Sequence, residues 1–251
     1  MTQFGFHTTG QQVVETFPEQ VRGRTCKYSL HDPEPYIDIN SRYHWHQREW
    51  YRSHHRHLPG PRAPRHHLPP RARSESKVTS VIQKIHAIDP CIKAVFVNLD
   101  LADYDSVRAA ASAIQSQTPK LDVLINNAGV MAVANFTLSK SGVEYQFAAN
   151  HVGHFLFTTL LTPLLLAAGN GSRIVNLSSS GHKCGPVRFD DYNFSDGKAY
   201  NAWDSYGQSK TANILFSIEL ANRGATKGLV AISVHPGSVY ETSLGANLTQ
   251  E

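Results

Sequence analysis

The stretch LDVLINNAG, at residues 121–129, joins a short apolar run to a turn built from small and polar residues. An apolar run of this length, bounded by turn residues, is typical of a strand buried on both faces of a parallel sheet. The turn Asn126-Asn127-Ala128-Gly129 follows at the carboxyl end of the strand, which is where such sheets bind their ligands. The segment therefore predicts a parallel sheet with a ligand site at its strand ends.

Strand and helix patterns alternate along the chain on both sides of this segment. Helices are expected over residues 103–117, 141–168 and 205–223. Short apolar runs stand at residues 93–101, 173–179 and 229–237, and they end in Asp100, Ser178-Ser179 and Pro236-Gly237. Strands that alternate with helices in this way predict an α/β fold with a doubly wound, Rossmann-like parallel sheet covered on both faces.

The composition fits one α/β domain, because the chain has 251 residues and 41% of them are hydrophobic. Its net charge of +4 comes from one place: residues 42–73 hold eight of the 24 basic residues and one of the 20 acidic ones. The remainder is slightly acidic, with 16 basic against 19 acidic residues. The charge therefore does not predict a nucleic-acid surface on the folded domain.

The three cysteines and the hydropathy bear on the compartment. Cys26, Cys91 and Cys184 are scattered and form no C-x-x-C pair, which predicts a reducing compartment, the cytoplasm, and no zinc knuckle. The longest apolar run, residues 155–169, falls short of the roughly 18 residues that a membrane-spanning helix needs. We expect no membrane span.

A basic stretch, YHWHQREWYRSHHRHLPGPRAPRHHLPPR at residues 43–71, differs from the rest of the chain. Its density of Pro and Arg disfavours helices and central strands. Its histidines could bind metal adventitiously, and its arginines and aromatic residues could bind single-stranded nucleic acid by charge and stacking. No spacing defines a closed metal site, so we expect neither a metal site nor a nucleic-acid partner.

The most informative side chains are Tyr206 and Lys210. In a helix they stand at i and i+4 on one face, where the ammonium would favour the phenolate and lower the tyrosine pKa. A tyrosine in that setting can exchange protons with an alcohol or a carbonyl. Alone the pair is usually a solvated helix face, just as Ser179 alone is usually a helix cap and Asn150 a satisfied helix residue.

Together these residues resemble one family. NNAG at residues 126–129, Asn150 in NHVGHF, the serine pair in RIVNLSSSGH, Tyr206 and Lys210 in Y-x-x-x-K, and HPG at residues 235–237 occur in the order found in short-chain dehydrogenases/reductases. The phrase AYNAWDSYGQSKTANILF is similar to the branch of retinol-dehydrogenase-like and WW-domain-oxidoreductase-like proteins. The resemblance covers residues 73–245 and implies an oxidoreductase that interconverts an alcohol and a carbonyl.

The resemblance also implies catalytic roles. Tyr206 would be the general acid/base, and Lys210 would lower its pKa and hold the nicotinamide ribose. Ser179 would bind the substrate oxygen, and Asn150 would complete a proton relay through water.

Further residues would contact an NADP(H) cofactor, with NAD(H) as the alternative. Arg73 would pair with a 2′-phosphate, which favours NADP(H). The remaining predicted contacts lie at strand ends, with Asp100 at the adenine, Asn126, Ala128 and Gly129 on the adenine-ribose side, and Pro236 and Gly237 at the nicotinamide. The resemblance also implies a small alcohol or carbonyl substrate and pairing of two copies through the helices around Asn150 and Tyr206.

The chain departs from the family at its start, because the family's first strand ends in a T-G-x-x-x-G-x-G loop that binds the pyrophosphate. VRGRT at residues 21–25 reads as the lead-in to that strand and RSESK at 73–77 as the turn after the second. We therefore divide the chain into a lead-in (1–25), an aberrant basic segment rich in His, Arg and Pro (26–72) that we expect to be disordered and to disrupt the first two strands, and an incomplete Rossmann-like domain (73–251).

Codon arithmetic offers a cause for that segment. A one-base shift makes the codons of Trp45-His46 and of Trp50-Tyr51 each encode glycine, at the spacing of the missing loop with one extra residue. The codons of Cys26-Lys27-Tyr28 can also contain an intron donor sequence. We therefore interpret residues 26–72 as the product of a splicing or gene-model error.

The other end departs as well. The family continues past HPG with substrate-covering helices and a last strand, which are missing here, and Thr242 stands one residue later than the family's threonine. The alternative to an enzyme is therefore a catalytically inactive remnant that cannot bind its cofactor.

Overall fold

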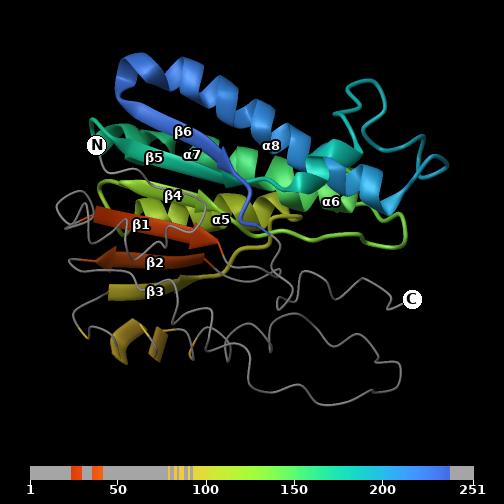
Figure 1. The fold of residues 1–251 in the computed structure, drawn as a ribbon. Coiled ribbons are helices and arrows are strands. Elements are labelled where there is room, and N and C mark those ends of the chain that lie inside the picture. The colour runs from red at the N-terminus through yellow and green to blue at the C-terminus, as the bar shows by residue number, and fades with distance from the viewer. Residues whose placement is uncertain are drawn as a thin grey trace. The chain divides into compact units, whose positions relative to one another are not determined.

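The computed structural model describes residues 24–29, 36–41, 79, 82–83, 85–87, 90 and 93–237. Six strands form one sheet in the order β3-β2-β1-β4-β5-β6 (Figure 1). They are β1 (Arg24–Ser29), β2 (Tyr36–Ser41), β3 (Lys93–Val97), β4 (Val123–Asn126), β5 (Ser172–Leu177) and β6 (Leu229–Val234). The neighbours β1 and β4, β4 and β5, and β5 and β6 pair in parallel. The predicted Rossmann-like α/β fold is confirmed.

The strand order reverses between β1 and β4. Ligands of open α/β sheets bind at such a switch point, beyond the carboxyl ends of the strands. Asn126, the last residue of β4, pairs with Asn176 of β5, so the NNAG turn and the serine pair leave the sheet side by side.

The crossover helices are α5 (Tyr104–Gln115), α7 (Gly153–Ala167) and α8 (Ala202–Gly224). Each follows one strand and precedes the next in the direction from β3 to β6, so right-handed crossovers place all three on one face. On β6, Leu229 and Ala231 are buried, whereas Val230 and Ile232, on the opposite face, are 42% and 45% exposed. The helices α5, α7 and α8 therefore cover one face of the sheet.

The core lies between this helical face and the sheet. Residues of α5 at the predicted helical spacing, Val107, Ala110, Ala111 and Ile114, are buried. On α7, Phe157, Leu161 and Leu165 are spaced by four residues and fully buried. Burying each such large side chain stabilises the fold by about 1.5–3 kcal/mol.

The helix expected over residues 141–168 is divided into three parts. It starts as α6 (Tyr145–Phe147), widens into the π-turn η1 (Ala148–Val152) and continues as α7. A π-turn inserts a residue into a helix and is often found at functional sites. Asn150 is the middle residue of this turn.

Parts of the segment predicted to be irregular are strands in the structure. β1 begins at Arg24, in the predicted lead-in, and places Cys26 beside Val123 of β4. β2 has the sequence YIDINS, whose aromatic and β-branched residues favour strands and precede the Pro- and Arg-rich stretch. The expected disorder of residues 26–72 is thus contradicted at 26–29 and 36–41, which form strands. Residues 42–72 lie outside those described, and the division of the chain into three parts stays a prediction.

The connection between β1 and β2 nevertheless departs from a doubly wound fold. A parallel crossover needs a dozen or more residues, whereas only residues 30–35 separate these two strands. Their arrows point in opposite directions in Figure 1. β1 therefore leads into a second strand at the position where the family places its glycine loop and first helix.

No helix within the described residues is long and apolar enough to cross a membrane.

Candidate active site

The helix α8 carries both members of the Y-x-x-x-K pair on its buried face. Asn201 caps the helix, because its side chain accepts hydrogen bonds from the backbone N–H groups of Trp203 and Asp204. Tyr206 and Lys210 are 3% and 2% exposed. The Lys210 Nζ lies 5.5 Å from the centroid of the Tyr206 ring, within the range of a cation–π interaction. The two side chains therefore share one face, as predicted, but that face is inside the protein.

Burial changes the proton affinity of both groups. It lowers the pKa of Lys210 to about 8, and the ammonium donates to the backbone oxygen of Leu177 at 3.2 Å. It also raises the pKa of Tyr206, against a hydrogen bond with the Ser179 side chain that lowers it. The expectation that Lys210 brings the tyrosine pKa below its ordinary value is thus wrong for this structure, because excluding water disfavours the charged form of both groups.

Ser179 meets Tyr206 at the end of β5. It caps the short helix η2 (Ser180–Cys184), and its Oγ accepts a hydrogen bond from the backbone N–H of Gly181 at 3.1 Å. A Cβ on Gly181 would lie 2.7 Å from Cε1 of the tyrosine ring. Glycine at this position therefore allows the turn after Ser179 to pass directly against the phenol ring.

Asn150 connects the π-turn to the NNAG turn. Its Oδ1 accepts from the Val130 backbone N–H at 2.7 Å, and its Nδ2 donates to the Val130 oxygen at 2.9 Å and to the Ser209 Oγ at 3.0 Å. A Cβ on Gly129 would stand 2.9 Å from the Asn150 Oδ1 and 3.4 Å from the Lys210 Nζ. The structure thus brings all four predicted catalytic residues to the carboxyl ends of β4 and β5.

The predicted cofactor contacts fall into two groups. Ala128 and Gly129 are buried beside Asn150, and the Nδ2 of the buried Asn126 donates to Thr158 at 2.8 Å and to Asn176 at 2.7 Å. The Asn126 amide therefore fastens β4 to α7 and β5.

The second group follows the outer strands. Asp100 is exposed after β3, where its Oδ1 accepts from the Ala102 N–H at 2.9 Å. Pro236 and Gly237 are exposed after β6, and Gly237 has a φ of 86°. Arg73 and Thr242 lie outside the described residues, and the cofactor contacts of this whole set stay predictions.

The sequence reasoning missed two residues that organise this site. Ser209 accepts from Asn150 and donates to the backbone oxygen of Tyr206 at 2.7 Å. Asn213, one turn beyond Lys210, donates to the backbone oxygens of Asn150 and Leu177, both at 3.1 Å. Both could have been found from their spacing: they stand at i+3 and i+7 from Tyr206, and such positions share a face of a helix.

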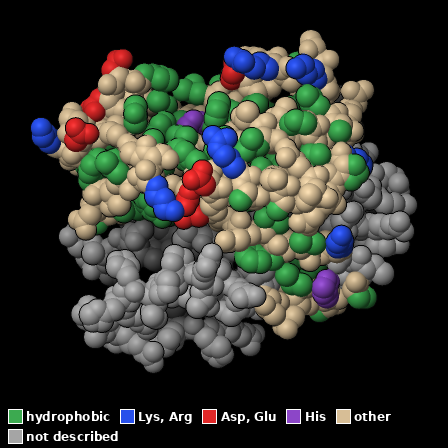
Figure 2. All heavy atoms as spheres, turned by 180° about the vertical axis from the view of Figure 1, so that it is seen from behind, with side chains coloured by type: hydrophobic (Ala, Val, Ile, Leu, Met, Phe, Trp, Pro, Cys, Tyr) green, Lys and Arg blue, Asp and Glu red, His purple; other side chains and the backbone are tan. Residues whose placement is uncertain are grey.

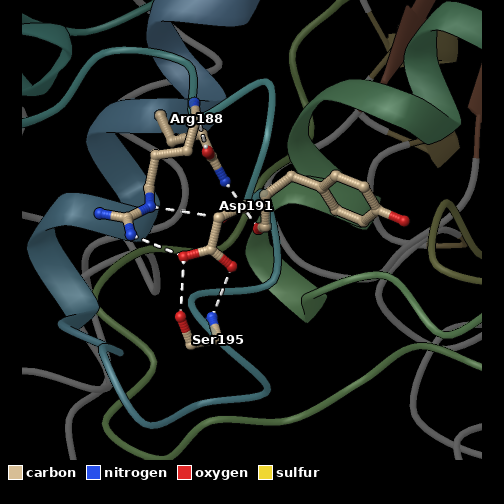
Figure 3. A network of polar contacts seen from close by, with 5 residues as sticks. Arg188, Asp191 and Ser195 are labelled. Atoms are coloured by element: carbon tan, nitrogen blue, oxygen red, sulfur yellow. Dashed lines mark hydrogen bonds and ion pairs between the residues drawn. The ribbon is translucent and has the colours of Figure 1, made fainter.

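The segment between Ser179 and α8 is held by a polar network (Figure 3). The Asp191 carboxylate accepts from the Arg188 guanidinium at 2.7 Å and from the Ser195 N–H at 2.5 Å, and these contacts, the backbone one foremost, hold the pKa of Asp191 below its usual value. Gln208 of α8 accepts from the Arg188 N–H at 2.9 Å and donates to the Tyr192 oxygen at 3.1 Å. The segment is thus tied to α8 between Tyr206 and Lys210.

In the part of the chain that the structure describes, no three His, Cys, Asp or Glu side chains come together as metal ligands.

The fold matches solved structures. An uncharacterized protein from Mycobacterium paratuberculosis is 41% identical, with a TM-score of 0.50 over 59% of this chain and 52% of that one. A metagenomic short-chain oxidoreductase, solved in complex with NADP, is 26% identical, with a TM-score of 0.51 over 66% of this chain and 69% of that one.

Curated proteins also match the chain. A short-chain dehydrogenase/reductase of Armillaria gallica is 40% identical over 67% of this chain and 55% of its own length. Retinol dehydrogenase 13 of Homo sapiens is 45% identical over 59% of this chain and 44% of its own length. The chain spans about half the length of the curated relatives that it matches.

A family model described as short chain dehydrogenase matches residues 67–251. These residues include β3 to β6, the serine pair and the Y-x-x-x-K pair. The chain belongs to the short-chain dehydrogenase family.

Proposed function

We propose that the chain is an oxidoreductase that transfers a hydride between NADP(H) and an alcohol or carbonyl substrate. The observation that carries this proposal is the meeting of the Ser179 hydroxyl, the Tyr206 phenol and the Lys210 ammonium at the carboxyl end of β5. Hydride transfer to or from a carbon leaves a charge on its oxygen, and these three groups can hold that oxygen and supply or remove its proton.

Each group has its own part. The Tyr206 phenol gives a proton to a carbonyl oxygen in reduction or takes one from an alcohol in oxidation. Because burial raises its pKa, its phenolate depends on the hydrogen bond with Ser179 and on the Lys210 cation. Ser179 donates to the same substrate oxygen, and Asn150 holds the turn at Val130 against α8 and completes the proton relay.

The nicotinamide side of the site fits the cofactor. When it is bound, the nicotinamide cofactor supplies or accepts the hydride. The Lys210 ammonium has three donors, and among the described residues it has one hydrogen-bond acceptor, the Leu177 oxygen. The remaining donors suit the ribose hydroxyls, and the absence of a side chain at Gly129 keeps the strand end free beside them. Ala128, Pro236 and Gly237 would complete this side.

The pyrophosphate side does not fit. A pyrophosphate is normally held by backbone N–H groups of a glycine-rich turn at a helix N-terminus. In the described residues, β1 is followed by β2 instead of a helix. We therefore expect the chain with this sequence to hold NADP(H) weakly, and we keep the inactive remnant as the alternative.

The choices of cofactor and substrate follow from relatives. NADP(H) is preferred over NAD(H) because a structural relative was solved with NADP and because Arg73 stands where a 2′-phosphate would be met. Several relatives are named retinol dehydrogenases. Retinol and its aldehyde are therefore the first substrates to test.

Two further properties belong to the proposal. The apolar side chains Phe155 of α7 and Ile218 of α8 are 47% and 54% exposed, and hydrophobic groups are visible among polar ones on the surface in Figure 2. Such side chains on the two helices that carry the site support pairing of two copies through them. The free, exposed Cys184 supports a reducing compartment, and we propose the cytoplasm.

The test is carbonyl-dependent oxidation of NADPH by the purified chain, measured with retinal and with a panel of aliphatic and aromatic aldehydes. Millimolar NADPH compensates for the weak binding that we expect. We expect Tyr206→Phe to lower the rate by roughly 10²–10⁴-fold, the usual contribution of a positioned acid/base. Equal rates for the two proteins would show that Tyr206 is not the acid/base, and no rate with any aldehyde would favour the inactive remnant.

A further inference from the structure

The buried face of α8 extends one turn beyond the Y-x-x-x-K pair to Asn213. This residue stands at i+3 from Lys210 and i+7 from Tyr206, so all three share a face of the helix. Asn213 is 2% exposed. A buried amide must be hydrogen-bonded to be tolerated, and its partners therefore indicate what it does.

The Asn213 side chain reaches two other elements. Its Nδ2 donates to the Leu177 oxygen at the end of β5 and to the Asn150 oxygen in the π-turn, both at 3.1 Å. Its Oδ1 lies 3.0 Å from Nδ1 of His151, also in the π-turn. One side chain thus joins α8, β5 and η1 by three contacts.

Both backbone oxygens bound by Asn213 belong to the site. The Leu177 oxygen also accepts from the Lys210 ammonium at 3.2 Å, so Asn213 and Lys210 bind the same atom. The Asn150 oxygen also accepts from Nδ1 of His154 at 3.0 Å. Asn213 therefore holds the Leu177 carbonyl that binds the Lys210 ammonium. Through the same Nδ2 it also holds the backbone of Asn150, whose side chain binds Val130 directly after the NNAG turn.

The π-turn explains why such a clamp is needed. Its wider hydrogen-bond pattern, with Gly153 N–H bonded to Ala148, interrupts the regular helical pairing around Asn150. Backbone oxygens at a π-turn need partners from outside the helix, and here Asn213 is one of them.

We propose that Asn213 is a positioning residue, which sets the register of Asn150 and of Lys210 by holding the Asn150 and Leu177 carbonyls together. The idea rests on the proposed oxidoreductase function for its catalytic consequence, whereas its structural part stands on the contacts alone. Asn213 itself need not touch the substrate.

The experiment uses two variants of similar size. Asn213→Leu removes every polar contact, and Asn213→Asp removes both N–H donors while keeping an oxygen for His151. Ser217→Ala is the matched control. Ser217 is buried on the same helix, where its Oγ accepts from the Asn176 side chain and donates to the backbone oxygen of Asn213. It contacts neither of the two carbonyls, of Asn150 and Leu177, that Asn213 holds. All three proteins lose buried hydrogen bonds of α8, so a general loss of stability affects them alike.

Hydrogen exchange measured by mass spectrometry is the first readout, because it needs no cofactor. We expect exchange of peptides covering residues 148–154 to accelerate about 10-fold in both Asn213 variants, and to keep the wild-type rate in the control. Unchanged exchange at the π-turn in both variants would overturn the proposal.

Kinetics with NADPH and retinal, or whichever aldehyde of the panel reacts fastest, form the second readout. A misplaced proton-transfer group lowers kcat more than it raises KM, and a fall in kcat of roughly 10–100-fold is expected. Wild-type kcat in both variants would contradict the catalytic part. An inactive wild-type protein whose Asn213 variants still show faster exchange would refute the proposed function and leave the positioning role supported.

Discussion

Replacing Gly129 with alanine is expected to damage the site more than the fold. The added Cβ would lie 2.9 Å from the Asn150 Oδ1 and 3.4 Å from the Lys210 Nζ. Carbon and oxygen atoms in contact are usually about 3.3–3.6 Å apart, so the amide must move by about half an ångström. It is not a free side-chain end, because three hydrogen bonds to Val130 and Ser209 hold it.

The magnitude follows from those bonds. Overpacking a tight site costs typically about 1–3 kcal/mol of unfolding free energy, and each weakened hydrogen bond accounts for about 1 kcal/mol. A displacement of this kind can lower the rate by up to about 10²-fold, since proton transfer depends on exact placement. Gly129→Ala should therefore lower kcat by one to two orders of magnitude while unfolding remains cooperative.

The matched control is Gly224→Ala. Its Cβ would be 3.0 Å from the Leu229 Cβ and 3.0 Å from the Leu229 oxygen, a comparable crowding at the far end of α8. Thermal unfolding and kcat are measured for both variants. Equal losses of kcat at equal losses of stability, or wild-type kcat in Gly129→Ala, would refute the view that this glycine leaves space for Asn150.

Three further predictions concern affinity, acid stability and the transcript. The purified chain should bind NADPH more weakly than micromolar by calorimetric titration, because β2 follows β1 where the glycine loop is expected; a micromolar or tighter dissociation constant would overturn this. His154 is fully buried, and burial lowers its pKa to about 3. Between pH 6.5 and about 3, the unfolded chain therefore binds a proton at this histidine that the folded chain does not bind. The unfolding free energy should fall as the pH falls through this window. In His154→Leu, the unfolding temperature should fall less steeply between about pH 7 and about pH 5. Transcript sequencing across codons 20–80 should reveal a spliced form that restores the glycine loop, and transcripts that encode only the present frame through Trp45 and Trp50 would contradict the splicing hypothesis.

The sequence was sufficient to predict the part of the fold in which the spacing of apolar residues and the polar residues at the strand ends agree. From residue 93 to residue 237, apolar strands alternate with helices, and their order fixed both the parallel pairing and the strand ends that carry Asn126 and Ser179. The N-terminal half was predicted less well. The sequence YIDINS directly precedes the stretch rich in Arg, His and Pro, and it was assigned to the same segment. Its aromatic and β-branched residues nevertheless favour a strand where a neighbouring strand edge is available.

The candidate site was predictable in its residue types but not in its electrostatics. A helical Tyr-Lys pair suggests that the cation lowers the phenol pKa, as it would at a surface. Both groups are instead buried, and desolvation then acts on both at once, raising the pKa of Tyr206 and lowering that of Lys210. Depth of burial depends on how η2 and η1 pack against α8, which a spacing of four residues does not encode.

Burial of Lys210 gives the site a pH dependence with a definite sign. With a pKa of about 8 in the folded protein against 10.5 for a free side chain, Lys210 loses its charge as the pH rises through about 8. The unfolded chain holds that proton up to about pH 10.5, so the lysine contribution to unfolding free energy rises with pH across this interval. In the proposed mechanism, proton transfer by Tyr206 has the opposite requirement, because the Lys210 cation would support its phenolate. Catalytic rate should therefore fall above about pH 8 under conditions where stability does not, and a rate that keeps rising beyond that pH would mean that the lysine is not the group that supports the phenolate.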